Sequence, residues 1–428
     1  MAPPGAAASA PPSADLASDS SPSTRWLPQD ELDRQAVLLI QSGGKLHRLQ
    51  PGEASPAGSR WLAPPTTRTT IDLPQGALWT VCGPSLLQFG FAAEPRLPTV
   101  HTQLCRSLIR GGPDGRQLLL STPLGAYRLE LADASSRASI EVSYRPTRPG
   151  SVLERRAFKP VLIIVAAEGS LTVHVQSAVP SAAAENGAAN GDSRPANQPQ
   201  AISLALGDGL AVVAGENMEK FRLQNIPRWY RSSVEREVDG LAGEDLHHFL
   251  DAAAESDPGL WQTLSTLSGY RRPETAALAG QLSLMAGNWQ PLVADYLNNE
   301  RMRSHWKNTL DLSRQIVASD SAAAEALRTA FVDAHGERGQ KLFELLCGLS
   351  EEQLAGNGLE ELVKNLEAER LDQRVLAIYQ LFLLTGKSLG YQPHAPTRAS
   401  VLAWRKELQA NRLSVVPPPD VIWERIPR

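Results

Sequence analysis

Apolar positions along the chain follow two different patterns, one in each half. From Asp33 to about Gln224 they form short runs such as AVLLI and ALWTV, bounded by glycine and proline, which predicts β-strands. From Glu244 onward they recur every three or four positions, which predicts helices with one buried face. We therefore expect a segregated, multi-domain α+β fold, with an N-terminal all-β part followed by a C-terminal all-α part.

Three glycine-containing pairs mark turns between the expected strands: Gly43–Gly44, Glu168–Gly169 and Asp208–Gly209. Links of this type are typical of β-hairpins, so each pair is expected to join neighbouring antiparallel strands. The segment 100–110 differs, because its apolar residues fit steps of four and so predict a short helix that interrupts the sheet.

Changes in composition divide the chain into segments. The predicted order is an Ala/Pro/Ser-rich disordered tail at 1–25, a β domain at 26–226 with a disordered insertion at 178–200, a linker at 227–243, a helical domain at 244–411 and an extended C-terminal tail at 412–428. The first segment cannot bury enough apolar surface to offset the entropy lost on folding. The polar insertion is tolerated because the entropy cost of closing a loop grows slowly with its length.

The helical half contains local signals for where helices begin and end. The block from Leu359 to Leu408 predicts three packed helices, and Gly386 suits the left-handed cap that ends the second one. Ser350 and Gln353 have the spacing of a capping box, in which each side chain accepts a hydrogen bond from the other residue's backbone N–H. Helices of this kind are expected to stack side by side.

The second helix of that block resembles a HEAT-type repeat. Asp372, Arg374 and Val375 carry this resemblance. With GKSLGYQP at 386–393, the block also resembles the C-terminal segment of multi-domain bacterial envelope proteins found notably in planctomycetes. The resemblance implies that Arg374 pairs with the carboxylate of a neighbouring repeat.

Two segments of the β half resemble FecR-like domains. They are VAAEGSLTV at 165–173 and LALGDGLAVV at 204–213. The resemblance covers about residues 32–224 and implies a jelly-roll or β-helix-like domain joined to HEAT-like repeats. It implies a regulatory role linked to envelope signalling and no catalytic activity.

Composition argues against two classes of partner. The chain is 42% hydrophobic and 21% charged, as in ordinary soluble globular proteins, and its net charge of −4 gives no electrostatic reason to expect nucleic acid. The longest apolar run, Val161–Ala167, is too short to cross a bilayer, and the N-terminal residues lack the basic start and apolar stretch of a signal peptide. We expect no membrane-spanning segment, and the compartment stays open between the cytoplasm and the cell envelope.

The sequence contains no motif for catalysis, cofactor binding or metal binding. Phosphate-binding loops, the dinucleotide-binding glycine pattern and the serine elbow of hydrolases do not occur. The adjacent His247 and His248 would point about 100° apart on a helix and so cannot share a metal ion. Cys82, Cys105 and Cys347 are expected to be buried free thiols, with pairing of the first two left open. We therefore predict that the protein is not an enzyme and has no cofactor.

Aromatic and arginine residues of the helical half are the best candidates for a site of contact with a partner protein, because both are enriched at binding hot spots. The candidate partner-binding residues are Arg301, Arg303, Trp306, Arg271 and Arg272. Core packing is the competing explanation for Trp306. The alternative is a β domain that binds a glycan or another small ligand. Exposed aromatic residues on one sheet face would favour it, with Trp61 and Trp79 as the residues to inspect.

Overall fold

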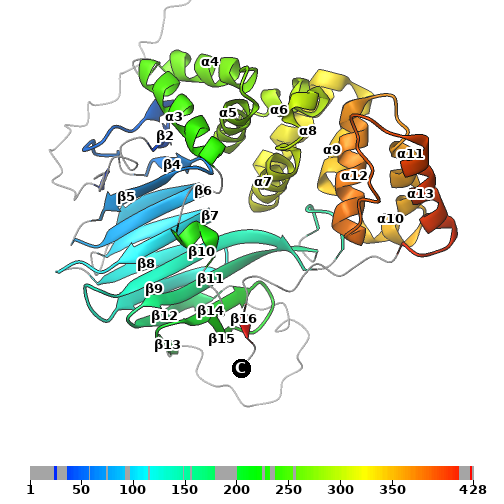
Figure 1. Cartoon of the computed structure of the whole chain (residues 1–428). Helices are drawn as coiled ribbons and strands as arrows, with labels where there is room; N and C mark the ends of the chain where they lie inside the picture. The colour runs from blue at the N-terminus through cyan, green and yellow to red at the C-terminus, as the bar shows by residue number, and fades with distance from the viewer. Residues whose placement is uncertain are drawn as a thin grey trace, which may run out of the picture.

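The computed structural model describes most of the chain. The described residues are 24–26, 36–56, 58–73, 76–91, 97–113, 116–147, 149–154, 157–178, 200–223, 227–231, 237–253, 257–413 and 425–426. An antiparallel sheet region occupies the first half and an all-helical region the second, as the apolar patterns predict (Figure 1). The insertion proposed at 178–200 lies almost entirely outside the described residues, as does most of each terminal tail.

The strands form one continuous sheet that folds over into two facing layers. Two long strands run through both layers: β6 (Leu78–Phe91) and β7 (Pro98–Arg110). One layer also holds β2 (Leu39–Ser42), β3 (Lys45–Arg48), β4 (Arg60–Ala63), β8 (Gln117–Thr122), β9 (Gly125–Leu131), β12 (Leu171–Ala178) and β13 (Gln200–Leu204). The other also holds β1 (Arg25–Trp26), β5 (Arg68–Asp72), β10 (Arg137–Pro146), β11 (Phe158–Glu168), β14 (Asp208–Val213), β15 (Glu219–Leu223) and β16 (Arg425–Ile426).

The pairing of β7 explains how one sheet makes two layers. Its first residues pair in parallel with β8, whereas its last residues pair antiparallel with β10. The partner strand β6 breaks its register between Cys82 and Leu86, and a bulge of this kind lets a strand bend. Leucines, valines and isoleucines from both layers meet in a single core, together with the fully buried Trp26 and Trp79.

The prediction of a helix at 100–110 is wrong, because these residues form the strand β7. The apolar spacing that suggested a helix arises from the bend. Val100 and Cys105 face the core between the layers, whereas Leu104 faces outward into the core that the helices share. Where a strand bends, the set of alternate side chains that faces the inner core can change. The apolar residues then no longer alternate regularly, and their spacing resembles that of a helix.

Two of the three expected hairpins are instead crossings between layers. Glu168–Gly169 links β11 to β12, and the turn before Asp208 links β13 to β14, but neither pair of strands forms a ladder. Gly209 lies within β14, where an added Cβ would come 2.4 Å from the Phe221 ring. The turn at Gly43–Gly44 does join the antiparallel strands β2 and β3, with positive φ at both glycines.

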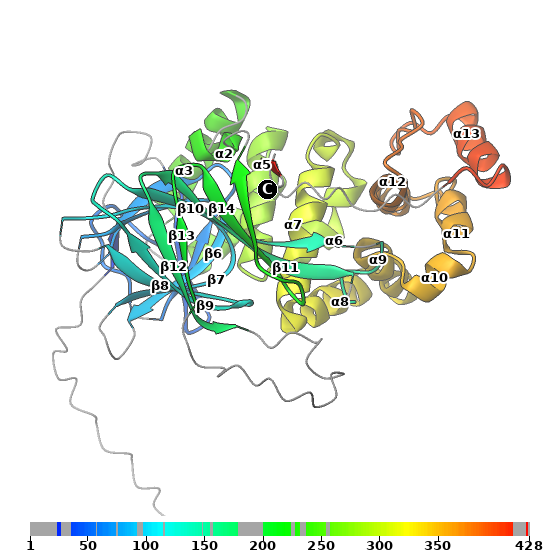
Figure 2. The ribbon, with the colours of Figure 1, turned by 90° about the horizontal axis from the view of Figure 1, so that it is seen from below.

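Helices follow the sheet in chain order. They are α2 (Arg228–Arg231), α3 (Glu237–Ala252), α4 (Asp257–Ser268), α5 (Pro273–Met285), α6 (Gln290–Ala294), η2 (Tyr296–Asn298), η3 (Glu300–Met302), α7 (Trp306–Ser319), α8 (Ser321–His335), α9 (Glu337–Cys347), α10 (Glu351–Ala355), α11 (Gly358–Asn365), α12 (Leu371–Thr385) and α13 (Arg398–Gln409). Helices α2 and α3 thus cover part of the proposed linker 227–243. The capping box at Ser350 and the left-handed Gly386 are both present. Seen from below, the helices extend away from the sheet in a row (Figure 2).

The helical row and the sheet share a hydrophobic core. Leu39, Leu62 and Leu86 point outward from β2, β4 and β6 and pack in the same cluster as the leucines of α3 to α12. Phe158 of β11 joins this cluster and lies under the Arg314 guanidinium of α7. The outer face of the sheet is therefore a packing surface for the helices, and the two halves form one body.

Candidate functional site

A fully buried arginine fastens the sheet to the first long helix. Arg48, at the end of β3, donates hydrogen bonds to the backbone oxygen of His247 (2.8 Å) and approaches the Nδ1 of the same ring (2.6 Å). Its guanidinium also pairs with Asp251 at 2.7 Å. Burial, and then the Arg48 charge, lower the pKa of His247, so the ring is held neutral and accepts the arginine N–H.

A cleft of about 480 Å³ opens where the sheet, α5 and α7 meet. Its sheet wall is built at the bend of β6, by Cys82, Gly83 and Pro84, with Arg106 of β7 beside them. Its helical wall comes mainly from α5 and α7, and Trp229 of α2 also lines it. A smaller hollow of about 160 Å³ shares Pro84, Arg106 and Gln315 with it and extends it along β10. Clefts between structural parts are common ligand sites.

The sheet wall carries an excess of positive charge. Glu141 of β10 is 3% exposed, and its carboxylate accepts a 2.7 Å hydrogen bond from Arg145. Arg106 lies on the other side of this carboxylate, with Nε 3.8 Å from Oε1, beyond hydrogen-bond distance. Two guanidinium groups thus face one carboxylate, and the Arg106 side chain keeps 39% of its surface exposed.

The helical wall is polar and partly acidic. Gln315 of α7 has a buried side-chain oxygen that accepts no hydrogen bond from the described residues. Glu274, in the first turn of α5, makes no ion pair with any residue that the structure describes, whereas Asp311 accepts hydrogen bonds from Tyr379 (2.7 Å) and Lys307 (2.5 Å). The cleft lining therefore carries a cation on its sheet side and carboxylates on its helical side.

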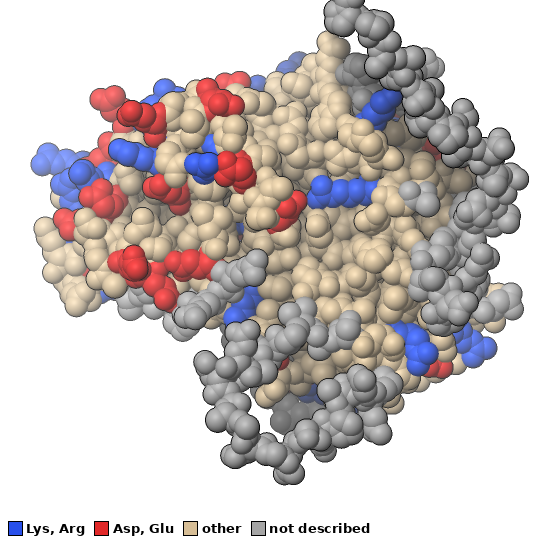
Figure 3. All heavy atoms as spheres, turned by 180° about the vertical axis from the view of Figure 1, so that it is seen from behind, with Lys and Arg blue, Asp and Glu red and all other residues tan. Residues whose placement is uncertain are grey.

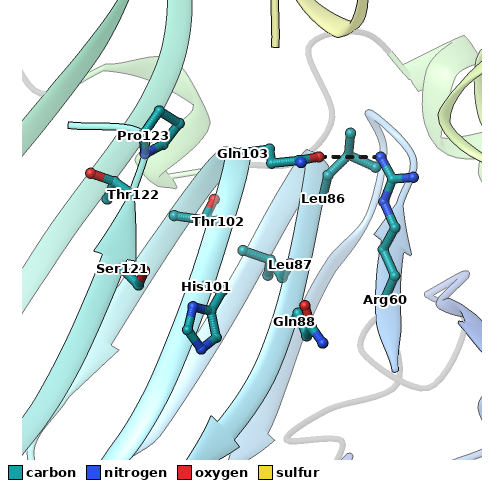
Figure 4. Close-up of a pocket in the computed structure, with 10 residues that line it drawn as sticks. All are labelled: Arg60, Leu86, Leu87, Gln88, His101, Thr102, Gln103, Ser121, Thr122 and Pro123. Atoms are coloured by element: carbon teal, nitrogen blue, oxygen red, sulfur yellow. Dashed lines mark hydrogen bonds between the residues drawn. The ribbon is translucent and has the colours of Figure 1, made fainter. Parts of the chain in front are cut away.

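A second, more open hollow of about 340 Å³ lies on the outer face of the sheet (Figure 4). Gln88, His101 and Ser121 come to it from the neighbouring strands β6, β7 and β8. Arg60 of β4 donates a 3.4 Å hydrogen bond to Gln103 at its rim. The lining consists of amides, hydroxyls, an imidazole, one guanidinium and a few apolar side chains, and includes no carboxylate.

Several predicted contact residues come together on the surface. Arg301 of η3 donates a 3.4 Å hydrogen bond to the backbone oxygen of Tyr270, next to Arg271 and Arg272. Arg303, two residues farther on, is also exposed. Arg272 pairs with Asp245 at 2.7 Å, but among the described residues no carboxylate lies within 4.0 Å of the other three guanidinium groups. We call these four residues the arginine surface.

The predicted aromatic candidates lie inside the protein. Trp306 is 6% exposed, and its Nε1 donates a 3.1 Å hydrogen bond to the backbone oxygen of Tyr296, so it packs in the helical core. Trp61 and Trp79 lie between the two sheet layers and are 1% and 0% exposed. None of the three can form a contact surface, and the exposed aromatic residues that would favour glycan binding are not found at these positions.

Arg374 donates its hydrogen bonds to backbone oxygens and not to the carboxylate of a neighbouring repeat. It donates hydrogen bonds to the backbone oxygens of Pro393, Ala368 and Glu369 at 2.6 to 2.7 Å. The carboxylate that does link helices in this region is Asp372, which lies two residues nearer the N-terminal end of α12 and binds Arg338 of α9.

The three cysteines lie in the packed interior. Cys82, Cys105 and Cys347 are free and buried, and burial raises their thiol pKa values to about 11, 11 and 12, so they stay protonated near neutral pH. Within the described ranges, no three His, Cys, Asp or Glu side chains converge as a metal site. Nor does any helix in that part of the chain combine the length and hydropathy needed to cross a bilayer.

The four arginines of the arginine surface were candidates from the sequence, but the cleft was not identified there. The cleft joins Arg106, Glu274 and Gln315, which are far apart in the chain, so no local pattern could reveal it. Comparisons with protein-family models, with curated proteins and with solved structures gave no match.

Proposed function

We propose that this protein is a non-catalytic scaffold that binds a partner protein, in the regulatory role that the FecR-like and HEAT-like resemblances imply. The observation that carries the proposal is the arginine surface. Arg271 and Arg301 are distant in sequence, yet both are exposed beside the Tyr270 backbone, and no described carboxylate pairs with either. Arginine and tyrosine are, with tryptophan, the residues enriched at hot spots of protein interfaces.

The surroundings of this surface support an acidic partner segment. Tyr270 is partly exposed and stacks edge-on against Phe249, with ring centroids 5.3 Å apart, which gives the surface a rigid aromatic base. Guanidinium groups bind carboxylates in a two-pronged geometry that lysine cannot match. On one face of the molecule, side chains of both signs crowd the end formed by the last helices, while the sheet part carries few (Figure 3).

The shared core supports the scaffold role as well. Because the outward leucines of the sheet pack with the helices, a partner bound to the helical row is held in a fixed position relative to the sheet. A rigid body of this kind suits a protein that presents one partner to another.

Charge reversal on the arginine surface tests the proposal. The full chain carrying Arg271→Glu and Arg301→Glu is compared with wild type by quantitative affinity capture, followed by direct binding to the recovered protein. We expect at least about tenfold weaker binding, because hot-spot residues at interfaces contribute about 2 kcal/mol or more. The matched control is Arg398→Glu with Lys406→Glu, an equal charge change on exposed positions of α13.

Equal binding by the charge-reversed protein and by wild type would contradict the proposal. A second pattern of results would favour the hollow in Figure 4 as the functional site. In that pattern, affinity capture retains no protein, and the wild type binds to a glycan array whereas a Gln88→Ala and Gln103→Ala variant does not. The amide and hydroxyl lining of that hollow is the observation behind this alternative, because side-chain amides both donate to and accept from sugar hydroxyls.

A further inference from the structure

The cleft between the sheet and the helices has the charge pattern of a ligand site that the proposed scaffold role does not use. Arg106 is the unusual residue. Arg145 already satisfies the Glu141 carboxylate through a 2.7 Å hydrogen bond, so Arg106 is the second cation beside a single anion. Its guanidinium donates no hydrogen bond to any described residue. A half-exposed guanidinium without a hydrogen-bond acceptor attracts an anion.

The opposite wall restricts which anion fits. Glu274 and Asp311 line the same cleft, so a ligand with several negative charges, such as a phosphate or a nucleotide, would be repelled on the helical side. A simple cation would in turn be repelled by Arg106. A ligand with a carboxylate at one end and an amine at the other satisfies both walls.

Gln315 supplies an independent observation. Its side-chain oxygen is buried, faces both hollows and accepts no hydrogen bond from the described residues. A buried acceptor left without a donor costs about 1 to 3 kcal/mol, and an N–H group of a ligand would remove that cost. Because Arg106 lines the same two hollows as Gln315, one ligand can contact both.

We propose that this cleft binds a small zwitterion, an amino acid or a short peptide, with its carboxylate on Arg106 and an N–H group on the Gln315 oxygen. The ammonium group then lies toward Glu274. The volume of about 480 Å³ is within the range of ligand pockets and exceeds what one ion needs. Since the ligand contacts both the sheet and the helices, its binding stabilises their junction and raises the unfolding temperature.

The test uses the full chain. Thermal unfolding is measured with the common amino acids and with a set of dipeptides, and with acetate, methylamine and inorganic phosphate as single-charge or polyanion probes. Calorimetric titration then gives the affinity of the best compound. We expect a zwitterion to raise the midpoint more than acetate or methylamine does, and Arg106→Gln to weaken its binding about tenfold or more.

Two further variants distinguish loss of binding in the cleft from a general effect of removing a charge or of misfolding. Arg110→Gln lies on the same strand but is exposed and outside the cleft, so it should bind as the wild type does. Gln315→Leu leaves the Glu141 cluster intact and should also weaken binding, which keeps the proposal testable if Arg106→Gln does not fold. The proposal is overturned if no zwitterion binds, if phosphate binds instead, or if neither cleft variant changes the affinity.

Discussion

At the scale of single residues, the polar groups that matter most lie at the junction of sheet and helices. Arg48 has no exposed surface, yet it donates hydrogen bonds to His247 and pairs with Asp251. The side-chain nitrogen of His247 can accept from Arg48 only when the ring is neutral. The residue that fastens the two halves therefore depends on the protonation state of its neighbour.

This dependence predicts a loss of stability in mild acid. Burial, and then the Arg48 charge, lower the pKa of His247 in the folded state below its ordinary value of 6.5, while Asp251 opposes the shift. Above that value neither state binds the proton and the contact is complete. As the pH falls through 6.5 the unfolded chain takes up the proton first, so the free energy of unfolding decreases.

The measurement is denaturant unfolding as a function of pH, compared with His247→Asn. Asparagine retains an acceptor for Arg48 but does not titrate, so its stability should change less with pH in this range. An equal pH dependence in both proteins would assign the effect to other groups.

At the scale of elements, α12 is fixed by one buried carboxylate. Asp372 is 1% exposed and accepts hydrogen bonds from Arg338 of α9 at 3.1 Å and from Asn298 of η2 at 3.2 Å. Asn298 in turn accepts from the Asp372 backbone N–H at 3.2 Å. Three elements that are distant in sequence thus meet at one side chain.

Substitution of this carboxylate should loosen the last part of the helical row. Asp372→Ala removes one partner of a largely buried pair and is expected to lower the free energy of unfolding by about 3 kcal/mol or more. Denaturant unfolding followed by the helical circular dichroism signal measures the change. Glu367→Ala, which breaks the exposed pair with Arg405, is the matched control and should have almost no effect. Similar losses in the two variants would show that Asp372 does not hold these helices together.

At the scale of the whole molecule, the sheet depends on the helices for burial of its outer face. Leu39, Leu62 and Leu86 are each 2% exposed or less, and all face the helices. Burial of a leucine side chain contributes about 1.5 to 3 kcal/mol, so the sheet without its helices exposes a surface that favours aggregation.

A truncation measures this dependence. We expect the fragment 26–226 to aggregate or to bind a hydrophobic dye, and the full chain to do neither. The same fragment with Leu39→Lys, Leu62→Lys and Leu86→Lys should regain solubility, because the substitutions place charge on the face that the helices no longer cover. A soluble, dye-free wild-type fragment would show that the sheet folds by itself.

The local sequence determined which half is sheet and which is helix, because strands and helices repeat over a few residues. It also determined the capping box at Ser350, the helix end at Gly386 and the turn at Gly43–Gly44, since these features depend on backbone groups only a few positions apart.

Tertiary structure decided the rest. Glu168–Gly169 has a typical hairpin pattern, but β11 is buried on both faces and pairs with β10 and β14, so the turn carries the chain to the other layer. The bend in β7 produced the spacing that suggested a helix at 100–110. The cleft and the arginine surface join residues that are far apart in the chain. Their proximity depends on which apolar faces bury each other, and that is a property of the whole molecule.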